Sequence, residues 1–241
     1  MSSPVNDKNI SPNFCAIILA GGLGTRLRSA VPDLPKCMAP VKGRPFIGYV
    51  IEYLAVQGVT KFILSLGYMH EVLIAYVNKA FPALNVDFVI EEEPLGTGGA
   101  IKYACCRATD TNVLVTNGDT MFNINVAEVM SFHLAGKADC TLSLKPMHNF
   151  DRYGVVTLNS DSSIQSFKEK QHYTQGLING GMYVLNAPRF LEEDLPAKFS
   201  FEKDYLEKLY TERRMFGIIQ DAYFIDIGIP EDYMRAQAEL R

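Results

Sequence analysis

Short, continuous runs of apolar residues alternate with segments of helical periodicity through the first half of the chain. The runs are long enough for strands that are buried on both faces of a sheet, and they cover residues 14–20, 62–66, 86–90 and 112–116. The helical segments between them are 45–58, 71–79 and 98–107. In the first of these helices, we expect Pro45 in the first turn and Gly58 as the C-cap. This alternation predicts a parallel sheet with helices on both faces.

Beyond Asp119 the pattern changes to strands with few helices between them. The predicted strands are 140–144, 155–158, 163–167, 182–185, 214–220 and 223–227, and the predicted helices are 126–134, 200–213 and 230–240. Ser200 suits the N-cap of the second of these helices. The fold class that we predict is therefore α/β, with a Rossmann-like, mostly parallel but mixed sheet flanked by helices and a small lobe built over it. We expect a disordered lead-in at 1–13 and one domain at 14–241, with halves at 14–120 and 121–241.

Composition and charge exclude several classes of protein. The 241 residues are 48% hydrophobic and 21% charged, which fits a packed core and excludes a disordered chain. The formal net charge of −4 argues against a general nucleic-acid binder, and no apolar run is long enough to span a membrane. The 5 cysteines include no C-x-x-C pair, so neither a disulfide framework nor a zinc site is favoured. We therefore expect a reduced, cytoplasmic, soluble protein.

A glycine-rich loop directly follows the first predicted strand. It reads Leu19-Ala20-Gly21-Gly22-Leu23-Gly24-Thr25-Arg26-Leu27, and Pro35-Lys36 follows it. Glycines at this place let backbone N–H groups turn toward an anion, beyond the carboxyl ends of parallel strands. The phosphate loop G-x-x-x-x-G-K-[ST] is absent, and Leu27 stands where a dinucleotide fingerprint needs its third glycine. The loop therefore predicts a phosphate site, with Arg26 and Lys36 as its cations.

Two carboxylates follow apolar strands in distant parts of the sequence. Asp119 ends the run Val113–Asp119, and Asp226 ends the run Tyr223–Asp226. Two carboxylates that converge with triphosphate oxygens make a hard-oxygen site that suits Mg²⁺. The alternative is that Asp119 is a turn-former in Asn117-Gly118-Asp119 and that Asp226 merely flanks a helix.

A third motif, Glu91-Glu92-Glu93-Pro94-Leu95-Gly96-Thr97-Gly98-Gly99, follows the third predicted strand. Gly96 and Gly98 permit a close approach of the backbone to a flat base edge, and Thr97 suits the cap of the next helix. One hypothesis is that Glu93 accepts hydrogen bonds from guanine N1–H and N2–H₂. The alternative for three consecutive acids is a solvated turn.

Late polar residues offer groups that a sugar phosphate needs. Glu169 and Asn179 supply acceptors for neighbouring hydroxyls, Lys170 supplies a cation, and Gly154 permits close approach to a sugar ring. The alternative is a charged strand edge followed by a hairpin turn.

Taken in order from Ala16 to the last predicted helix, these motifs resemble the sugar-1-phosphate nucleotidylyltransferase family, whose signature is G-G-x-G-T-R-L followed by P-K. The resemblance implies a GT-A-like fold with a sugar-binding lobe, a nucleoside triphosphate and a sugar 1-phosphate as substrates, and Mg²⁺ as cofactor. It implies no nucleic-acid or membrane partner, and a homodimer stays open.

The resemblance also assigns roles to residues. Arg26 and Lys36 would act on phosphates as catalytic residues, and Asp119 and Asp226 would hold Mg²⁺. For the sugar phosphate, the resemblance implies Glu169, Lys170 and Asn179, and we add Gly154 because it permits close approach. From the motifs themselves we predict these nucleotide-binding residues: Leu19, Ala20, Gly21, Gly22, Gly24, Thr25, Glu93, Pro94, Gly96, Thr97, Gly98 and Asn117.

Finer features at 28–40, 149–154, 176–181 and 224–233 resemble one branch of that family. The branch implies GTP as donor, D-glycero-α-D-manno-heptose 1-phosphate as acceptor, and GDP-heptose for bacterial surface polysaccharide such as capsule as product. Alternatives within the family are guanylyl transfer to mannose 1-phosphate and uridylyl transfer to an amino-sugar 1-phosphate. An alternative from another class is a non-catalytic sensor of nucleotide sugars.

Overall fold

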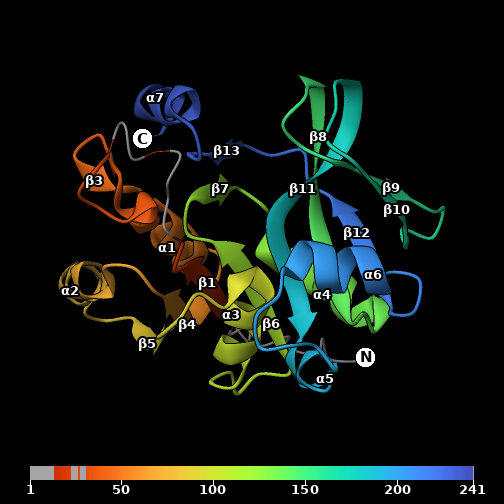
Figure 1. Cartoon of the computed structure of the whole chain (residues 1–241), viewed down its shortest axis with the longest axis horizontal. Coiled ribbons are helices and arrows are strands. Elements are labelled where there is room, and N and C mark those ends of the chain that lie inside the picture. Colours follow the sequence, from red (N-terminus) through yellow and green to blue (C-terminus); the bar gives the residue numbers. More distant parts are fainter. Residues whose placement is uncertain (1–13, 23–26, 28–30, 241) are drawn as a thin grey trace, which may run out of the picture.

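The computed structural model describes residues 14–22, 27 and 31–240 (Figure 1). The predicted lead-in at 1–13 lies outside the described residues, as do Gly24, Thr25 and Arg26 of the glycine loop. The helices are η2 (Lys36–Met38), α1 (Phe46–Val56), α2 (His70–Ala80), α3 (Gly96–Cys105), α4 (Val126–Gly136), α5 (Ala187–Leu191), η3 (Phe201–Leu206), α6 (Glu207–Leu209) and α7 (Pro230–Glu239). The strands are β1 (Phe14–Ala20), β2 (Pro40–Val41), β3 (Arg44–Pro45), β4 (Val59–Leu66), β5 (Asn85–Ile90), β6 (Asn112–Asn117), β7 (Thr120–Phe122), β8 (Cys140–Phe150), β9 (Val155–Leu158), β10 (Ile164–Lys168), β11 (Tyr173–Asn186), β12 (Met215–Ile219) and β13 (Phe224–Asp226).

A central sheet joins the two halves of the chain. Its main path runs β10-β9-β11-β6-β1-β4-β5, and β8 and β12 extend it from β11. The four strands β5, β4, β1 and β6 are parallel, as the alternation of strands and helices predicts. The later strands β11 and β8 join antiparallel, and β12 pairs parallel with β8. The sheet is thus mixed, with a parallel core, and Gly21 and Gly22 directly follow the carboxyl end of β1.

Helices cover both faces of this sheet. Apolar residues of α1, α2, α4 and α7 pack with one face of β1, which includes Ala16 and Ile18. Residues of α3, α5 and η3 pack with the other face, which includes Cys15 and Ile17. Because all four of these strand residues are at most 1% exposed, β1 is buried on both faces as its continuous apolar run predicts.

A small lobe stands beyond the sheet. The outer parts of β8 and β11 form a long pair that projects from the rest of the molecule, with β9 and β10 beside it (Figure 1). Phe150, Val155 and Ile178 form its small buried cluster. The strand-rich second half thus extends the central sheet and carries the lobe at its projecting end.

Some local predictions need correction. Pro45 is the N-cap of α1 and ends β3, so it stands before the first turn, and Gly58 lies one residue beyond the C-cap, Gln57, with φ +93°. Ser200 does cap a helix, by accepting a hydrogen bond from the Lys203 N–H, but that helix starts as the π-helical η3 and ends at Leu209. The short elements β7 and α5 were not predicted, since three to five residues carry no measurable periodicity.

All five cysteines are free thiols. Among the described residues, no helix combines the length and apolar character that a membrane crossing requires.

Candidate active site

One lysine and two aspartates meet at the carboxyl edge of the parallel strands. Lys36 Nζ forms an ion pair with the Asp119 carboxylate and lies 3.4 Å from Asp226 Oδ1. Lys36 begins η2, Asp119 lies in the turn after β6, and Asp226 is the last residue of β13. Their side chains are 14%, 28% and 22% exposed, so the charges are screened only in part and remain open to a ligand.

Backbone contacts explain why these distant residues converge. Gly118 donates its N–H to Leu19 O at 2.8 Å, which fixes the segment before Asp119 against the end of β1. A Cβ at Gly118 would lie 3.4 Å from Cys37 Cβ, so the same glycine packs against the helix that carries Lys36. Gly118 and Asp119 do form a turn between β6 and β7, as the alternative for Asp119 states, and this turn places the carboxylate beside Lys36.

The second carboxylate is held by the β7–β13 pair. Asp226 stands opposite Thr120, and Ile227 N–H donates to Asp119 O at 3.1 Å. Gly228 N–H donates to Asp226 Oδ1 at 2.8 Å, which orients the carboxylate toward the side of Lys36. The neighbouring Cys37 thiol is buried, and burial followed by the charge of Asp119 raises its pKa to about 12, so it is unsuited to act as a nucleophile.

Only the first part of the glycine loop lies within the described residues. A Cβ at Gly21 would lie 2.7 Å from Glu91 Oε1 and 3.2 Å from Gly67 N, so the ends of β1 and β4 approach each other too closely for a side chain. Gly22 is exposed, and a Cβ there would meet nothing within 4 Å. Leu19 and Ala20 close β1 beside it. Phosphate binding by this loop stays a prediction, and Gly24, Thr25 and Arg26 fall outside the described residues.

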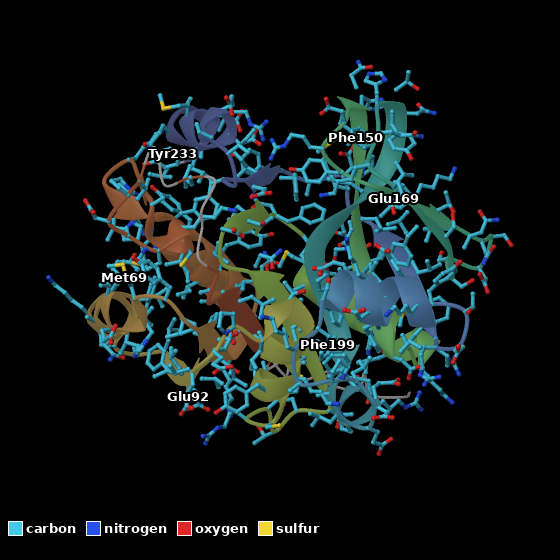
Figure 2. The ribbon with its side chains drawn as sticks, in the orientation of Figure 1. Met69, Glu92, Phe150, Glu169, Phe199 and Tyr233 are labelled. Atoms are coloured by element: carbon cyan, nitrogen blue, oxygen red, sulfur yellow. The ribbon has the colours of Figure 1, made fainter. Side chains whose placement is uncertain are left out.

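The acidic segment after β5 divides into a structural and an exposed part. Glu91 accepts hydrogen bonds from Ser65 Oγ at 3.1 Å and from Leu95 N–H at 3.0 Å, so it organises the loop from within. Glu93 and Pro94 are exposed, and no described residue forms a hydrogen bond or ion pair with the Glu93 carboxylate. Figure 2 shows the neighbouring Glu92 at the outer end of β5. The base-reading role of Glu93 stays a prediction.

The glycines of the same segment serve packing. Gly96 has φ +72°, and a Cβ there would lie 2.5 Å from Phe199 O. Gly98 is buried against the Phe199 ring and donates its N–H to Phe199 O at 3.0 Å. The prediction that Thr97 caps α3 is wrong, because the helix begins at Gly96 with Leu95 as N-cap. Thr97 instead donates to Glu202 Oε2, an acid that the sequence analysis did not single out.

Asn179 and Asn117 stand close together where β11 bulges away from β8. Asn179 Oδ1 accepts from Gly181 N–H at 3.0 Å, and Asn179 Nδ2 donates to Tyr183 OH at 2.9 Å. Gly181 has φ +70°, and a Cβ there would lie 2.7 Å from Asn117 Nδ2. The bulge thus brings the predicted sugar residue Asn179 next to the nucleotide half of the site.

The other predicted sugar residues lie in the lobe. Glu169 and Lys170 are exposed in the connection from β10 to β11, and Figure 2 shows Glu169 in the lobe with Phe150. No hydrogen bond or ion pair between described residues joins either side chain to Asp119 or Asp226. A Cβ at Gly154 would lie 2.5 Å from Lys168 O, so this glycine first serves the close approach of β9 and β10.

Arg152 and Tyr153 connect the lobe to α7 and β13, which the sequence analysis did not anticipate. Arg152 forms an ion pair with Asp232 in the first turn of α7, and Tyr153 packs edge-on against Phe224 with ring centroids 6.0 Å apart. Burial, and then the charge of Asp226, raise the pKa of Tyr153 to about 12. The segment 149–154 was noted for its glycine, whereas its arginine carries the contact.

The carboxylate pair fits a magnesium ion. Both acids contact one ammonium group and are partly exposed, so an oxygen of each carboxylate lies within reach of the same cation. The described residues contain no group of three or more His, Cys, Asp and Glu side chains that could hold a metal. Mg²⁺ commonly takes one or two carboxylates and completes its shell with phosphate and water, so two protein ligands suffice.

A mixed α/β sheet that carries a cation, two acids and Gly21-Gly22 at the carboxyl edge of its parallel strands is the arrangement expected of an α/β enzyme that binds its ligand at that edge. The profile of the nucleotidyl transferase family matches residues 15–241, and the chain belongs to this family. It is accordingly a nucleotidyltransferase. The predicted resemblance and fold class are thereby confirmed.

Individual relatives match over nearly the whole chain. D-glycero-α-D-manno-heptose 1-phosphate guanylyltransferase from Aneurinibacillus thermoaerophilus is 50% identical over 94% of this chain and 98% of its own length. The protein of the same name from Campylobacter jejuni is 44% identical, over 90% of this chain and 96% of its own length. The crystal structure of HddC from Yersinia pseudotuberculosis matches with a TM-score of 0.86 and 40% identity, over 95% of this chain and 100% of that one. A second structure of HddC is a complex with GMP-PN.

Proposed function

We propose that the enzyme transfers GMP from GTP to D-glycero-α-D-manno-heptose 1-phosphate and releases GDP-heptose and pyrophosphate. The two heptose 1-phosphate guanylyltransferases that are 50% and 44% identical over nearly the full chain support this donor and this acceptor. The GMP-PN complex of HddC supports guanine as the base. Mannose-1-phosphate guanylyltransferases are 31% and 33% identical in two examples, so mannose 1-phosphate is the weaker alternative.

The contact of Lys36 with both Asp119 and Asp226 carries the reaction class. A nucleoside triphosphate and a sugar phosphate bring about six negative charges together, and their repulsion must be offset locally. Since the whole chain has a net charge of −4, the neutralisation depends on placed cations. Lys36 is held between two acids and is partly exposed to solvent. Its ammonium group can therefore form an ion pair with an incoming phosphate.

In the proposed reaction, a phosphate oxygen of the sugar 1-phosphate attacks the α-phosphorus of GTP in line. The new O–P bond forms as the bond from the α-phosphorus to the bridging oxygen breaks, and pyrophosphate leaves with that electron pair. Lys36 neutralises charge on the phosphates, while Asp119 and Asp226 are fixed by the contacts of Ile227 and Gly228. Catalysis is then positioning and charge neutralisation, and it needs no covalent intermediate.

Asp119 and Asp226 would hold Mg²⁺ in this scheme. When bound, the ion supplies a further positive charge to the triphosphate oxygens. The two carboxylates would determine the position of the ion, because Asp119 follows the end of β6 and Asp226 is the last residue of β13.

A substrate panel tests the proposal. Purified enzyme is given each of four nucleoside triphosphates with heptose, mannose or glucosamine 1-phosphate, with and without MgCl₂, and pyrophosphate release is measured. We expect the highest kcat/KM for GTP with the heptose phosphate, and loss of turnover when EDTA removes the metal. A Lys36→Ala preparation controls for contaminating activity. Preference for another nucleotide or for mannose 1-phosphate contradicts the assignment, and absence of turnover with every pair contradicts catalysis.

A further inference from the structure

Glu202 lies in a polar cluster that joins the segment after β5 to η3. Its Oε2 accepts hydrogen bonds from Thr97 Oγ1 at 2.8 Å and from Ser200 Oγ at 3.0 Å. Thr97 Oγ1 in turn accepts the N–H of Phe201 at 2.9 Å. Figure 2 shows Phe199, at the start of this segment, beside α3. The carboxylate is therefore fixed in place by the motif that we predicted to bind the nucleotide.

The two oxygens of this carboxylate differ in their surroundings. Two hydroxyl donors occupy Oε2, which uses the lone-pair capacity that one carboxylate oxygen offers. Within residues 14–22, 27 and 31–240, no hydrogen bond reaches Oε1 and no cation pairs with Glu202. The side chain is half-buried. A charged oxygen in such a place has acceptor capacity that a ligand could use.

Glu202 also lies beside the bulge of β11. Tyr183 is buried, and its pKa is raised well above the usual value, first by burial and then by the charge of Glu202. Tyr183 OH accepts a hydrogen bond from Asn179 Nδ2 at 2.9 Å. The Tyr183 ring packs edge-on against the ring of Phe201, the residue before Glu202, with centroids 4.9 Å apart. Glu202 and the Asn179–Tyr183 hydrogen bond therefore lie in the same region of the molecule.

We propose that Glu202 is a further specificity-determining residue, which accepts a hydrogen bond from a hydroxyl group of the acceptor sugar. This assignment rests on the proposed function, and it adds a further acceptor to the predicted pair Glu169 and Asn179. A carboxylate is the side chain best suited to this task, because an ionised acceptor strengthens a hydroxyl hydrogen bond. Thr97 and Ser200 are positioning residues for it, and Tyr183 is one for Asn179.

The test compares Glu202→Gln with Glu207→Gln. The first variant keeps an oxygen that can accept from Thr97 and Ser200, so we expect an unchanged melting temperature. The second removes the same charge from an exposed residue of α6. For Glu202→Gln we expect KM for the sugar 1-phosphate to rise at least tenfold while KM for GTP changes less than twofold. Glu207→Gln should leave both constants unchanged.

Deoxy analogues of the accepted sugar 1-phosphate identify the bond. If Glu202 accepts from one hydroxyl, the analogue that lacks this hydroxyl should show little difference between wild type and Glu202→Gln. An unchanged KM for the sugar phosphate in an active Glu202→Gln enzyme overturns the assignment. A rise in KM for GTP alone also overturns it and places the carboxylate at the ribose. If the wild type releases pyrophosphate with no acceptor, the proposed function fails, and the assignment fails with it.

Discussion

Lys36 and Asp226 are separated by 190 positions, yet Lys36 Nζ lies 3.4 Å from Asp226 Oδ1 and also pairs with Asp119. Two segments from the ends of the chain thereby meet at one edge of the sheet. The lysine offsets two carboxylates that would otherwise repel each other at short range. The same contact keeps a cation beside a pair of acids that suits a metal, which is the arrangement that the joining of two polyanions requires.

Removal of either charge should impair turnover. We expect Lys36→Ala and Asp119→Ala each to lower kcat/KM at least about tenfold, which corresponds to about 1.4 kcal/mol. Steady-state pyrophosphate release measures the effect. Lys79→Ala, which removes an exposed lysine from α2, is the matched control and should leave kcat/KM unchanged. Normal turnover in either site variant would contradict the roles given to these residues.

Two glycines should separate folding from ligand binding. Gly96→Ala places a side chain at φ +72° and 2.5 Å from Phe199 O, so we expect the free energy of unfolding to fall by about 2 kcal/mol. Gly22→Ala meets nothing within 4 Å, so we expect unchanged stability but a higher KM for GTP. Urea denaturation and steady-state kinetics give the two readouts. A Gly22→Ala enzyme with an unaltered KM for GTP would argue against close approach of this backbone to phosphate.

The junction between the lobe and α7 should depend on Asp232. Its carboxylate pairs with Arg152 and, at 3.0 Å, with Arg235 Nη1, and it is 12% exposed. Asp232→Asn removes the charge that both arginines share, so we expect a loss of about 2 kcal/mol in the free energy of unfolding. Glu231→Gln, one residue earlier and exposed, is the control. Equal denaturation midpoints for the two variants would show that the pairing contributes little.

Buried His133 should make stability fall in mild acid. Its ring contacts Thr141 Oγ1 at 2.9 Å and Asn112 Oδ1 at 3.0 Å, and burial lowers its pKa from 6.5 to about 4. Between these pH values the unfolded chain binds a proton that the folded chain excludes, so stability falls as pH drops through this window. The full effect is up to about 3 kcal/mol. Urea midpoints measured from pH 7 to pH 4 should fall less steeply for His133→Gln, and an equal slope in this variant would exclude His133 as the cause.

The sequence alone determined the parallel core and the family of the chain. Continuous apolar runs such as 14–20 and 112–116 can be buried only as central strands, and these strands formed as predicted. The sequence also shows that Gly21 and Asp119 each follow a predicted parallel strand. Because the carboxyl ends of parallel strands lie at the same edge of a sheet, the two residues were expected to lie at one edge. The family signature and the match over residues 15–241 agree with that prediction.

Only the tertiary structure decided which polar groups form hydrogen bonds within the protein and which stay open to a ligand. The sequence analysis treated Gly96, Thr97 and Gly98 as one base-reading motif, but Phe199 and Glu202, about a hundred positions later, take up their contacts. The ion pair between Arg152 and Asp232 was not predicted either. An ion pair between a loop of the lobe and the last helix leaves no periodic pattern in the local sequence. The periodic patterns of helices and strands predict which residues a few positions apart share a face. The contact partner of a side chain depends instead on how elements that are distant in the sequence pack together.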